Sequence, residues 1–264
     1  MVKEQKKNFI VYYAILFIAI ILSLFLTPDI NAFVDSSYTF GAHRGSSVLY
    51  TENTIEAIQH AVEEPRYKFV EFDIQYTKDK KIVVHHDKTL FRLQHKRVKI
   101  SDLTYEELLD VSVYHIPLYE EVMGIINKQK KVNIEIKSQG NFEDDKQLAD
   151  WLIEDLEKRG LLQSVLVSSI SKDVIAYIDE TYPQIKLGQI FFILPATYLP
   201  GKFFTEKLYQ NVTESGADYL LLHGINLRDY DALIELKPAD KTLVFWYFDD
   251  AMYVIHPTEK KEIW

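Results

Sequence analysis

Two pairs of charged residues in this chain are spaced like side chains on one face of a β-strand. Glu71 and Asp73 form the first pair, and Glu135 and Lys137 form the second. Residues two apart in a strand point to the same side, so each pair faces one way. One acidic pair at a strand end is usually a solvent-exposed loop edge, but the repetition of the pattern favours a site.

Three carboxylates that converge repel one another unless a cation lies among them. Ligation by oxygen alone suits Mg²⁺ or Ca²⁺ rather than zinc or copper. We therefore expect Glu71, Asp73 and Glu135 to hold one divalent cation, Mg²⁺ or Ca²⁺.

Histidines supply groups that accept or donate protons near neutral pH. His43 ends one apolar run, and His85 and His86 end another, just before Asp87. A lone histidine is more often structural than catalytic. Hydrolysis of a phosphodiester, however, needs one group to take a proton from the nucleophile and a second to protonate the leaving oxygen. His43 and one of the two adjacent histidines provide that pair.

Short apolar runs alternate with amphipathic stretches along most of the chain, which is a βα pattern. The runs interpreted as strands are Thr39–His43, Phe69–Ile74, Val132–Ile136, Val165–Ser168, Leu187–Phe192, Tyr219–His223 and Leu243–Phe248, and the stretches interpreted as helices are Thr54–Glu63, Tyr119–Lys128, Asp144–Arg159, Lys172–Thr181, Lys202–Ser215 and Leu227–Leu236. Strands separated by helices pair in parallel, in a barrel or a doubly wound sheet. Because barrel enzymes build their sites at the carboxyl ends of strands, where the polar residues lie here, we expect a (β/α)8 TIM-like barrel.

Two segments depart from the alternation of strands and helices. Thr77 to Pro117 holds a turn, a short strand and a small helix, and we interpret it as an insertion after the second strand. After Asp250 only fourteen residues remain, so the last helix and the eighth strand are expected to be missing. Met252–Ile255 is too close to its predecessor for a parallel return, so it would pair antiparallel or lie elsewhere. The barrel would then be truncated, closed atypically or closed by another chain, and an open barrel would expose the edges of its first and last strands.

The N-terminus carries eighteen consecutive residues without a charge, Phe9 to Leu26. As a helix they would be about 27 Å long, close to the thickness of a bilayer's hydrocarbon core. We expect a cytoplasmic tail at 1–8, a transmembrane helix at 9–26, a linker at 27–38 and a barrel domain at 39–264 outside the cytoplasm, because three lysines precede the segment. A cleaved signal peptide, with Ile30-Asn31-Ala32 as its cleavage site, is the alternative.

Composition narrows the classes of function. The formal net charge is −9, and no basic run interleaved with aromatic residues offers a surface for nucleic acid. The chain has no cysteine, which excludes disulfides, thiolate metal sites and a thiol nucleophile. Neither feature predicts an oligomeric state.

Several short motifs occur in a fixed order. They are Ala42-His43-Arg44-Gly45, Glu52-Asn53-Thr54, Glu71-Phe72-Asp73, Thr77-Lys78-Asp79, Val83-Val84-His85-His86-Asp87 and Glu135-Ile136-Lys137. In order and spacing they resemble the glycerophosphodiester phosphodiesterases of the membrane-anchored bacterial type, from about Thr39 to Phe248. The resemblance departs at Trp246-Tyr247-Phe248-Asp249, where the family usually has Trp-Thr-Val-Asn, and at the short C-terminus.

The resemblance implies a role for each residue of the site. His43 and His86 would be the acid/base pair, Arg44, Lys137 and Trp246 would bind substrate, and Glu71, Asp73 and Glu135 would hold the metal. His85 would be a wall residue. Glu52, Asn53 and Thr54 would shape the first loop and cap its helix.

The implied activity is metal-dependent hydrolysis of small glycerophosphodiesters to glycerol phosphate and an alcohol at the cell surface. The hydroxyl beside the phosphate would attack phosphorus, and water would open the resulting cyclic phosphate. Two alternatives stay open. One is a phospholipase D-like enzyme acting on lysolipids, although such proteins are usually disulfide-bonded. The other is a catalytically impaired surface binding protein on the same fold.

Overall fold

A closed ring of strands forms the centre of the protein. The computed structural model describes residues 28–32, 38–192, 202–256 and 263–264, so the expected tail and transmembrane helix lie outside the described residues. Eight strands follow one another around the ring as β1, β2, β4, β5, β6, β7, β8 and β9, and β3 pairs with β2 outside it. Their bounds are Tyr38–Ala42 (β1), Phe69–Tyr76 (β2), Ile82–Val84 (β3), Lys131–Ile136 (β4), Val165–Ser169 (β5), Lys186–Phe191 (β6), Tyr219–His223 (β7), Thr242–Trp246 (β8) and Ala251–Ile255 (β9). The predicted barrel is confirmed.

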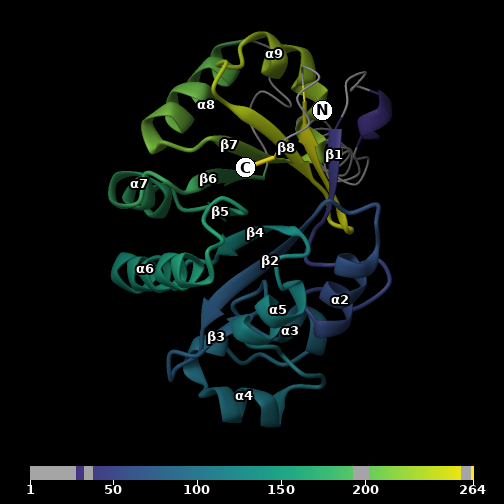
Figure 1. Ribbon diagram of the computed structural model, residues 1–264, viewed down its shortest axis with the longest axis vertical. Helices are drawn as coiled ribbons and strands as arrows, with labels where there is room; N and C mark the ends of the chain where they lie inside the picture. The colour runs from purple at the N-terminus through teal and green to yellow at the C-terminus, as the bar shows by residue number, and fades with distance from the viewer. Residues whose placement is uncertain (1–27, 33–37, 193–201, 257–262) are drawn as a thin grey trace, which may run out of the picture.

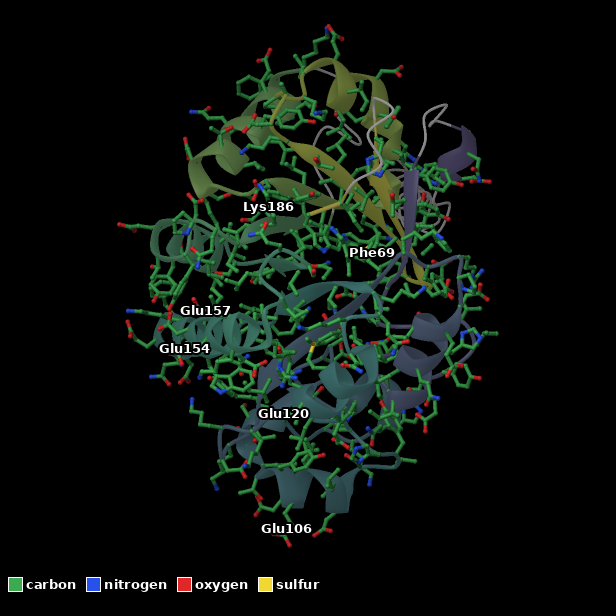
Figure 2. The ribbon with its side chains drawn as sticks, viewed as in Figure 1. Phe69, Glu106, Glu120, Glu154, Glu157 and Lys186 are labelled. Atoms are coloured by element: carbon green, nitrogen blue, oxygen red, sulfur yellow. The ribbon has the colours of Figure 1, made fainter. Side chains whose placement is uncertain are left out.

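Helices cover the outside of the ring (Figure 1). They are α2 (Ile55–Glu63), α5 (Tyr119–Ile126), α6 (Phe142–Arg159), α7 (Lys172–Thr181), α8 (Lys202–Ser215) and α9 (Tyr230–Glu235), with short 3₁₀ helices η1 (Ile30–Ala32) and η4 (Gly224–Asp229). In α6 the buried Leu148, Leu152 and Leu156 recur every four residues and face the sheet. Glu154 and Glu157 of the same helix point outward (Figure 2). Among the described helices, none is both long enough and apolar enough to cross a bilayer.

The prediction that the eighth strand is missing is wrong. β9 is antiparallel and pairs with both β8 and β1, so it fills the eighth position and leaves neither neighbour with an exposed edge. Only four residues connect β8 to β9, and there is no helix between them. The Asp249 side chain shapes this turn by accepting a hydrogen bond from the Ala251 amide (2.9 Å). An antiparallel hairpin needs no crossover, which is why so short a C-terminus closes the barrel.

The insertion after β2 forms a small unit with its own core. It contains β3, α3 (Phe91–Gln94), η2 (Ile100–Asp102) and α4 (Tyr105–Val111). The buried side chains of this unit are Val83, Leu90, Ile100, Leu108 and Ile116. β3 runs antiparallel to β2, and the His85 amide donates to the Asp73 carbonyl (3.1 Å), so the two adjacent histidines follow β3 at the level of the carboxylates on β2.

The amino ends of the strands are closed by Trp264. Its ring packs against Phe69 and Tyr219, and its indole nitrogen donates to the Ser164 carbonyl (3.1 Å). The Lys131 ammonium donates to the carbonyl of Trp264 (2.6 Å). Figure 1 accordingly shows the C-terminus among the central strands, and Figure 2 shows Phe69 near the centre of the molecule. With this end filled, the opposite end of the barrel is open for a site.

Candidate active site

A cavity of about 560 Å³ opens at the carboxyl ends of the strands. Seven of the eight residues predicted for the site line it: His43, Arg44, Glu71, His86, Glu135, Lys137 and Trp246. The eighth, Asp73, is fully buried, and its carboxylate lies within 4.8 Å of those of Glu71 and Glu135. The structure therefore brings together the whole predicted set from three strands and three loops.

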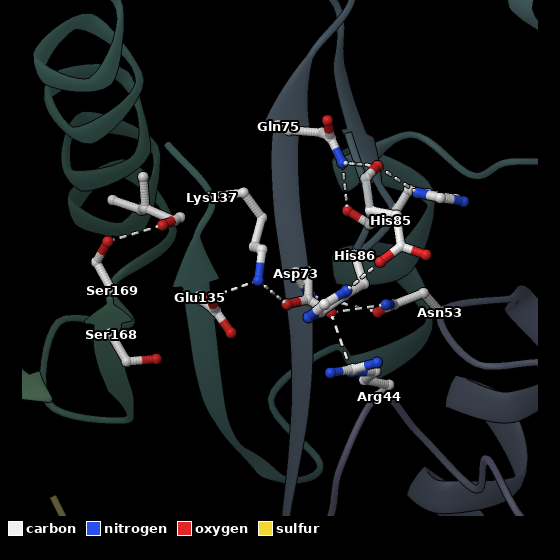
Figure 3. Close-up of polar contacts among 12 residues, drawn as sticks. Arg44, Asn53, Asp73, Gln75, His85, His86, Glu135, Lys137, Ser168 and Ser169 are labelled. Atoms are coloured by element: carbon white, nitrogen blue, oxygen red, sulfur yellow. Dashed lines mark hydrogen bonds and ion pairs between the residues drawn. The ribbon is translucent and has the colours of Figure 1, made fainter. Parts of the chain in front are cut away.

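The carboxylates of Glu71, Asp73 and Glu135 form the floor of the site. The Lys137 ammonium lies between two of them, 2.6 Å from Glu135 Oε1 and 3.5 Å from Asp73 Oδ1 (Figure 3). Burial, reinforced by the other two carboxylates, raises the pKa of Glu71 well above its usual range. Burial also raises the pKa of Glu135. Lys137 alone thus does not offset the negative charge gathered at this floor.

Asp73 is the member of the trio whose pKa is lowered. Burial would raise its pKa, but Lys137, His86 and Arg44 outweigh burial and hold that pKa well below its usual range. The Asn53 amide donates to Asp73 Oδ2 (2.8 Å), and the Asp73 amide donates back to Asn53 Oδ1 (3.3 Å). Asn53, expected only to shape the loop, therefore fixes the orientation of a carboxylate of the site.

The loop after β1 brings Arg44 over the carboxylates. Arg44 and Gly45 both have left-handed backbones, with φ of 59° and 76°, and the Ala57 backbone approaches so closely that a Cβ on Gly45 would clash. In this turn the Arg44 amide donates a hydrogen bond to Glu71 Oε2 (2.8 Å), and the Arg44 guanidinium forms an ion pair with Asp73 (3.5 Å). Thr54 caps α2 by accepting from the Ala57 amide (3.3 Å), as predicted.

The carboxylate floor fits a hard divalent cation. All the ligand atoms it offers are oxygens, which suits Mg²⁺ or Ca²⁺. Asp73 Oδ1 is fully buried and forms no hydrogen bond, and its ion-pair partner Lys137 stays 3.5 Å away, so this oxygen can still accept a cation. A cation would also favour the ionised forms of Glu71 and Glu135, whose pKa values burial raises.

His43 directly follows β1 and lies beside the floor. Its Nδ1 lies 3.2 Å from the Asp249 carbonyl, which only accepts hydrogen bonds, so Nδ1 carries the proton and Nε2 keeps a lone pair. Nε2 lies 3.9 Å from Glu71 Oε2. Burial and the neighbouring Arg44 lower the pKa of His43 to about 3. The ring is therefore neutral at pH 7 and suited to accept a proton.

His86 is held by a chain of charged groups. Its Nδ1 lies 2.7 Å from Asp87 Oδ1, and Arg92 donates from Nε to Asp87 Oδ2 (2.6 Å). The other end of the same guanidinium donates to Glu52 (2.5 and 2.8 Å). Burial would raise the pKa of Asp87, but the hydrogen bonds from His86 and Arg92 hold it well below its usual range. An ionised Asp87 thus fixes the proton on Nδ1 and leaves Nε2 for the substrate.

His85 differs from its neighbour. It is buried, its Nδ1 bonds to the Asp87 carbonyl (3.0 Å), and it is absent from the lining of the cavity. The Gln75 amide donates to the carbonyls of His85 (2.6 Å) and Asp87 (3.0 Å), which secures the loop to β2 (Figure 3). In this structure His85 supports the loop that presents His86.

The opposite wall of the cavity is apolar. It is formed by Ile170, Ile190, Phe192, Leu221, Trp246, Phe248 and Met252. The rings of Phe192, Trp246 and Phe248 lie 5.8 to 5.9 Å apart between centroids, and His223 packs against Trp246 (4.8 Å) and Phe248 (4.6 Å). Burial lowers the pKa of His223 to about 4, so it adds no charge to this wall at pH 7. The cavity therefore has one charged half and one apolar half.

Three features of the site were missed in the sequence. Asp87 belongs to one of the motifs but was given no role. A carboxylate directly after a candidate histidine could have indicated a partner for the ring of that histidine. Phe192 and Phe248 end two of the predicted strands, so their place at the mouth was implicit in the strand assignment. Nothing in the local sequence pointed to Arg92, because its partner Glu52 lies forty residues away.

The chain is similar to a known family of phosphodiesterases over most of its length. The model of the glycerophosphoryl diester phosphodiesterase family matches residues 43–247. A protein of Bacillus altitudinis named glycerophosphodiester phosphodiesterase is 31% identical over 157 residues, which cover 56% of this chain and 64% of that protein. This match thus spans less than two thirds of the relative's length.

Two further similarities bear on fold and chemistry. A solved structure of a glycerophosphodiester phosphodiesterase from Thermotoga maritima is 28% identical, with a TM-score of 0.63 over 80% of this chain and 85% of that one. A protein of Homo sapiens named lysophospholipase D is 38% identical over 116 residues, which cover 38% of this chain and 36% of that protein.

Proposed function

Since the chain belongs to the glycerophosphoryl diester phosphodiesterase family, we propose that it hydrolyses glycerophosphodiesters to glycerol phosphate and an alcohol. One observation carries the proposal. His43 and His86 line one cavity above a buried carboxylate trio, and each has its Nδ1 bonded to an oxygen so that Nε2 is available. A phosphodiesterase needs two such groups, one to accept a proton and one to donate it.

A divalent cation belongs to this proposal. Glu71, Asp73 and Glu135 would hold it, and when bound it would lower the pKa of the attacking hydroxyl and offset the charge of the phosphate. Arg44 and Lys137 line the same half of the cavity and would bind the phosphate oxygens, Arg44 through a forked guanidinium and Lys137 as a point charge. Both also stabilise negative charge that develops in the transition state.

The two histidines are assigned by their surroundings. His43, which burial keeps neutral, takes the proton from the glycerol hydroxyl that attacks phosphorus. His86 acts as the imidazolium, with its Nδ1 proton held by the Asp87 carboxylate, and gives its Nε2 proton to the departing alcohol oxygen. The cyclic phosphate formed in this step is opened by water, with the roles exchanged: His86 takes a proton from water, and His43 returns one to the glycerol oxygen.

A second candidate substrate, a lysolipid, is favoured by the apolar wall. Ring centroids 5.8 to 5.9 Å apart belong to rings in direct contact, so Phe192, Trp246 and Phe248 leave no gap for a quaternary ammonium among them. Their outer faces offer apolar surface, which suits an alkyl chain better than a small polar alcohol. The human relative named lysophospholipase D is consistent with this candidate.

The location at the cell surface is also a proposal. Phe9 to Leu26 are uncharged and long enough to span a bilayer, and the three lysines before them favour a cytoplasmic N-terminus. Mass spectrometry of the protein from membrane fractions tests this. An intact N-terminus supports a retained anchor, whereas a mature N-terminus near Phe33 would show cleavage.

The activity is tested directly with the full chain. Glycerophosphocholine, glycerophosphoglycerol and lysophosphatidylcholine are each incubated with the protein and Mg²⁺ or Ca²⁺, and the released alcohol and phosphate product are measured before and after chelation. Metal-dependent hydrolysis of either small diester supports the first substrate class. Hydrolysis of the lysolipid alone supports the second. No hydrolysis of any of the three would favour the alternative of a catalytically impaired binding protein.

A further inference from the structure

The mouth of the cavity has an apolar rim. Ile170, Phe192 and Phe248 line the cavity, yet their side chains are also 59%, 45% and 68% exposed. Val48 and Leu49, in the loop after β1, are 62% and 61% exposed. The four loops that carry these residues all follow carboxyl ends of ring strands, so they lie at the same end of the barrel. Exposed apolar residues gathered around a binding site are typical of a contact surface.

A basic hairpin lies beside this rim. Residues 88–100 contain Lys88, Arg92, Lys96, Arg97 and Lys99 and no acidic residue, although acidic residues outnumber basic ones in the whole chain. A bridge between Thr89 and Lys99 closes the hairpin, and its basic side chains are exposed. Arg92 lines the cavity, which fixes the hairpin at the edge of the mouth. The Arg92 guanidinium is paired with Asp87 and Glu52, and the other four basic residues of the hairpin complement an anionic surface.

The described chain starts on the outside of the barrel, between the β8–β9 turn and the amino end of β1, where the Tyr38 hydroxyl donates to Asn31 Oδ1 (3.2 Å). The Tyr247 hydroxyl donates to the Pro28 carbonyl (3.0 Å), and Tyr247 is the residue between Trp246, which lines the cavity, and Phe248. Leu26, the last residue of the uncharged stretch, is two residues before Pro28. Two residues span at most about 7 Å. A membrane segment that ends at Leu26 would therefore hold the barrel close to the bilayer surface, and the apolar rim and the basic hairpin decide which end faces it.

We propose that the mouth of the barrel docks on the surface of the membrane. The apolar rim enters the interface, and the basic hairpin contacts anionic lipid headgroups, while the amino end with Trp264 faces away. Apolar burial and headgroup attraction act together in interfacial binding, each basic residue contributing about fivefold at an anionic surface. The inference rests on the proposed membrane anchor but not on the proposed hydrolysis, so its test measures lipid contact and not activity.

The absence of cysteine makes a site-specific test available in the full chain. Leu49→Cys and Phe248→Cys variants, and Lys158→Cys as the control, are labelled with an environment-sensitive fluorophore and reconstituted into vesicles that contain anionic lipid and nitroxide-labelled lipid. Lys158 is 75% exposed in the last turn of α6, the end of that helix next to the amino ends of the strands. We expect at least twofold quenching at positions 49 and 248 and little at 158.

A second variant tests the contribution of the basic hairpin. Lys88→Ala/Lys99→Ala in the Leu49→Cys background should weaken the docking equilibrium roughly 25-fold on anionic vesicles, because about fivefold is lost per charge. On zwitterionic vesicles it should have little effect. Equal, weak quenching at all three positions would overturn the proposal, since only the N-terminal segment would then touch lipid. A signal at position 49 that rises with protein concentration without lipid would overturn it too, and would assign the rim to contacts between copies of the chain.

Discussion

Asp87→Asn is the substitution that best isolates the catalytic use of His86. Asp87 Oδ1 holds the Nδ1 proton of His86 at 2.7 Å, and Arg92 holds the other carboxylate oxygen at 2.6 Å. An asparagine of the same shape presents its NH₂ group to one of these two partners, and Arg92 accepts no hydrogen bond, so the NH₂ group turns toward His86. The His86 ring then takes the other tautomer, with its proton on Nε2. Nε2 would then have no lone pair to take the proton from water in the second step, and the imidazolium that donates in the first step would lose the carboxylate that stabilises it.

The expected loss follows from what that nitrogen contributes. A lost hydrogen bond to a charged group is worth about 1.5–3 kcal/mol, or roughly 10- to 10²-fold in rate. Loss of the general acid and base function itself is worth about 10²–10⁴-fold. We therefore expect kcat to fall by about 10² to 10⁴ while KM changes little, measured by release of glycerol phosphate from glycerophosphocholine. Asp102→Asn removes an exposed carboxylate from the same insertion and should leave kcat within about twofold.

A second readout separates the tautomer from general damage. ¹⁵N NMR of histidine-labelled protein reports which ring nitrogen carries the proton, and the His86 resonances are identified by their loss in His86→Ala. The proton should move from Nδ1 to Nε2 in Asp87→Asn. Activity within threefold of the parent protein, with the tautomer changed, would refute the role given to His86.

Three further outcomes are expected. Calorimetry should detect one Mg²⁺ or Ca²⁺ per chain, and Glu71→Gln/Asp73→Asn should abolish that binding; unchanged binding would exclude the carboxylate trio as the site. Burial lowers the pKa of His223 to about 4, whereas in the unfolded chain the same imidazole binds a proton near pH 6.5. The neutral, buried His223 therefore stabilises the fold above about pH 6.5, and this contribution is lost as the pH falls toward 4. Between pH 7.5 and 4.5 the free energy of unfolding, measured in urea, should fall for the parent protein by up to about 3 kcal/mol more than it falls for His223→Gln. Equal falls in the two proteins would contradict this. Val254→Pro removes an amide from β9, which pairs on both edges, and should cost about 1–3 kcal/mol in the same assay; an unchanged value would show that β9 does not close the barrel.

Much of the fold was predictable because local and periodic patterns agree with it. The bounds predicted for α7 and α8 match the structure, since apolar spacing marks both helices and Ser171 caps the first. Antiparallel pairing of Met252–Ile255 was one of the alternatives left open and is confirmed, but the same rules could not predict that this strand closes the barrel. β9 pairs with β1 and β8 because the other seven strands of the ring leave one position between those two. The local sequence of Ala251–Ile255 does not indicate that a hairpin strand fills this position.

The candidate site, like the fold, was predictable only in part. Residues at strand ends, such as Glu71 and Glu135, were found because strand geometry alone fixes where they point. Arg92 and Asn53 were not given their present contacts, because each acts through a partner on another element, Glu52 and Asp87 for Arg92 and Asp73 for Asn53. Such roles come from the way loops fold over the barrel mouth.

The central claim is that His43 and His86 are the two proton-transfer groups of a phosphodiesterase, and the hydrolysis rates of three alanine variants test it most directly. With glycerophosphocholine and saturating metal, His43→Ala and His86→Ala should each lose about 10²–10⁴ in kcat. The double variant should lose less than the product of the two, because removal of one member already disables the pair. His85→Ala, which removes a buried ring absent from the cavity lining, should retain far more activity. A loss in a folded His85→Ala as large as that in His86→Ala, or no loss in any of the three, would contradict the account.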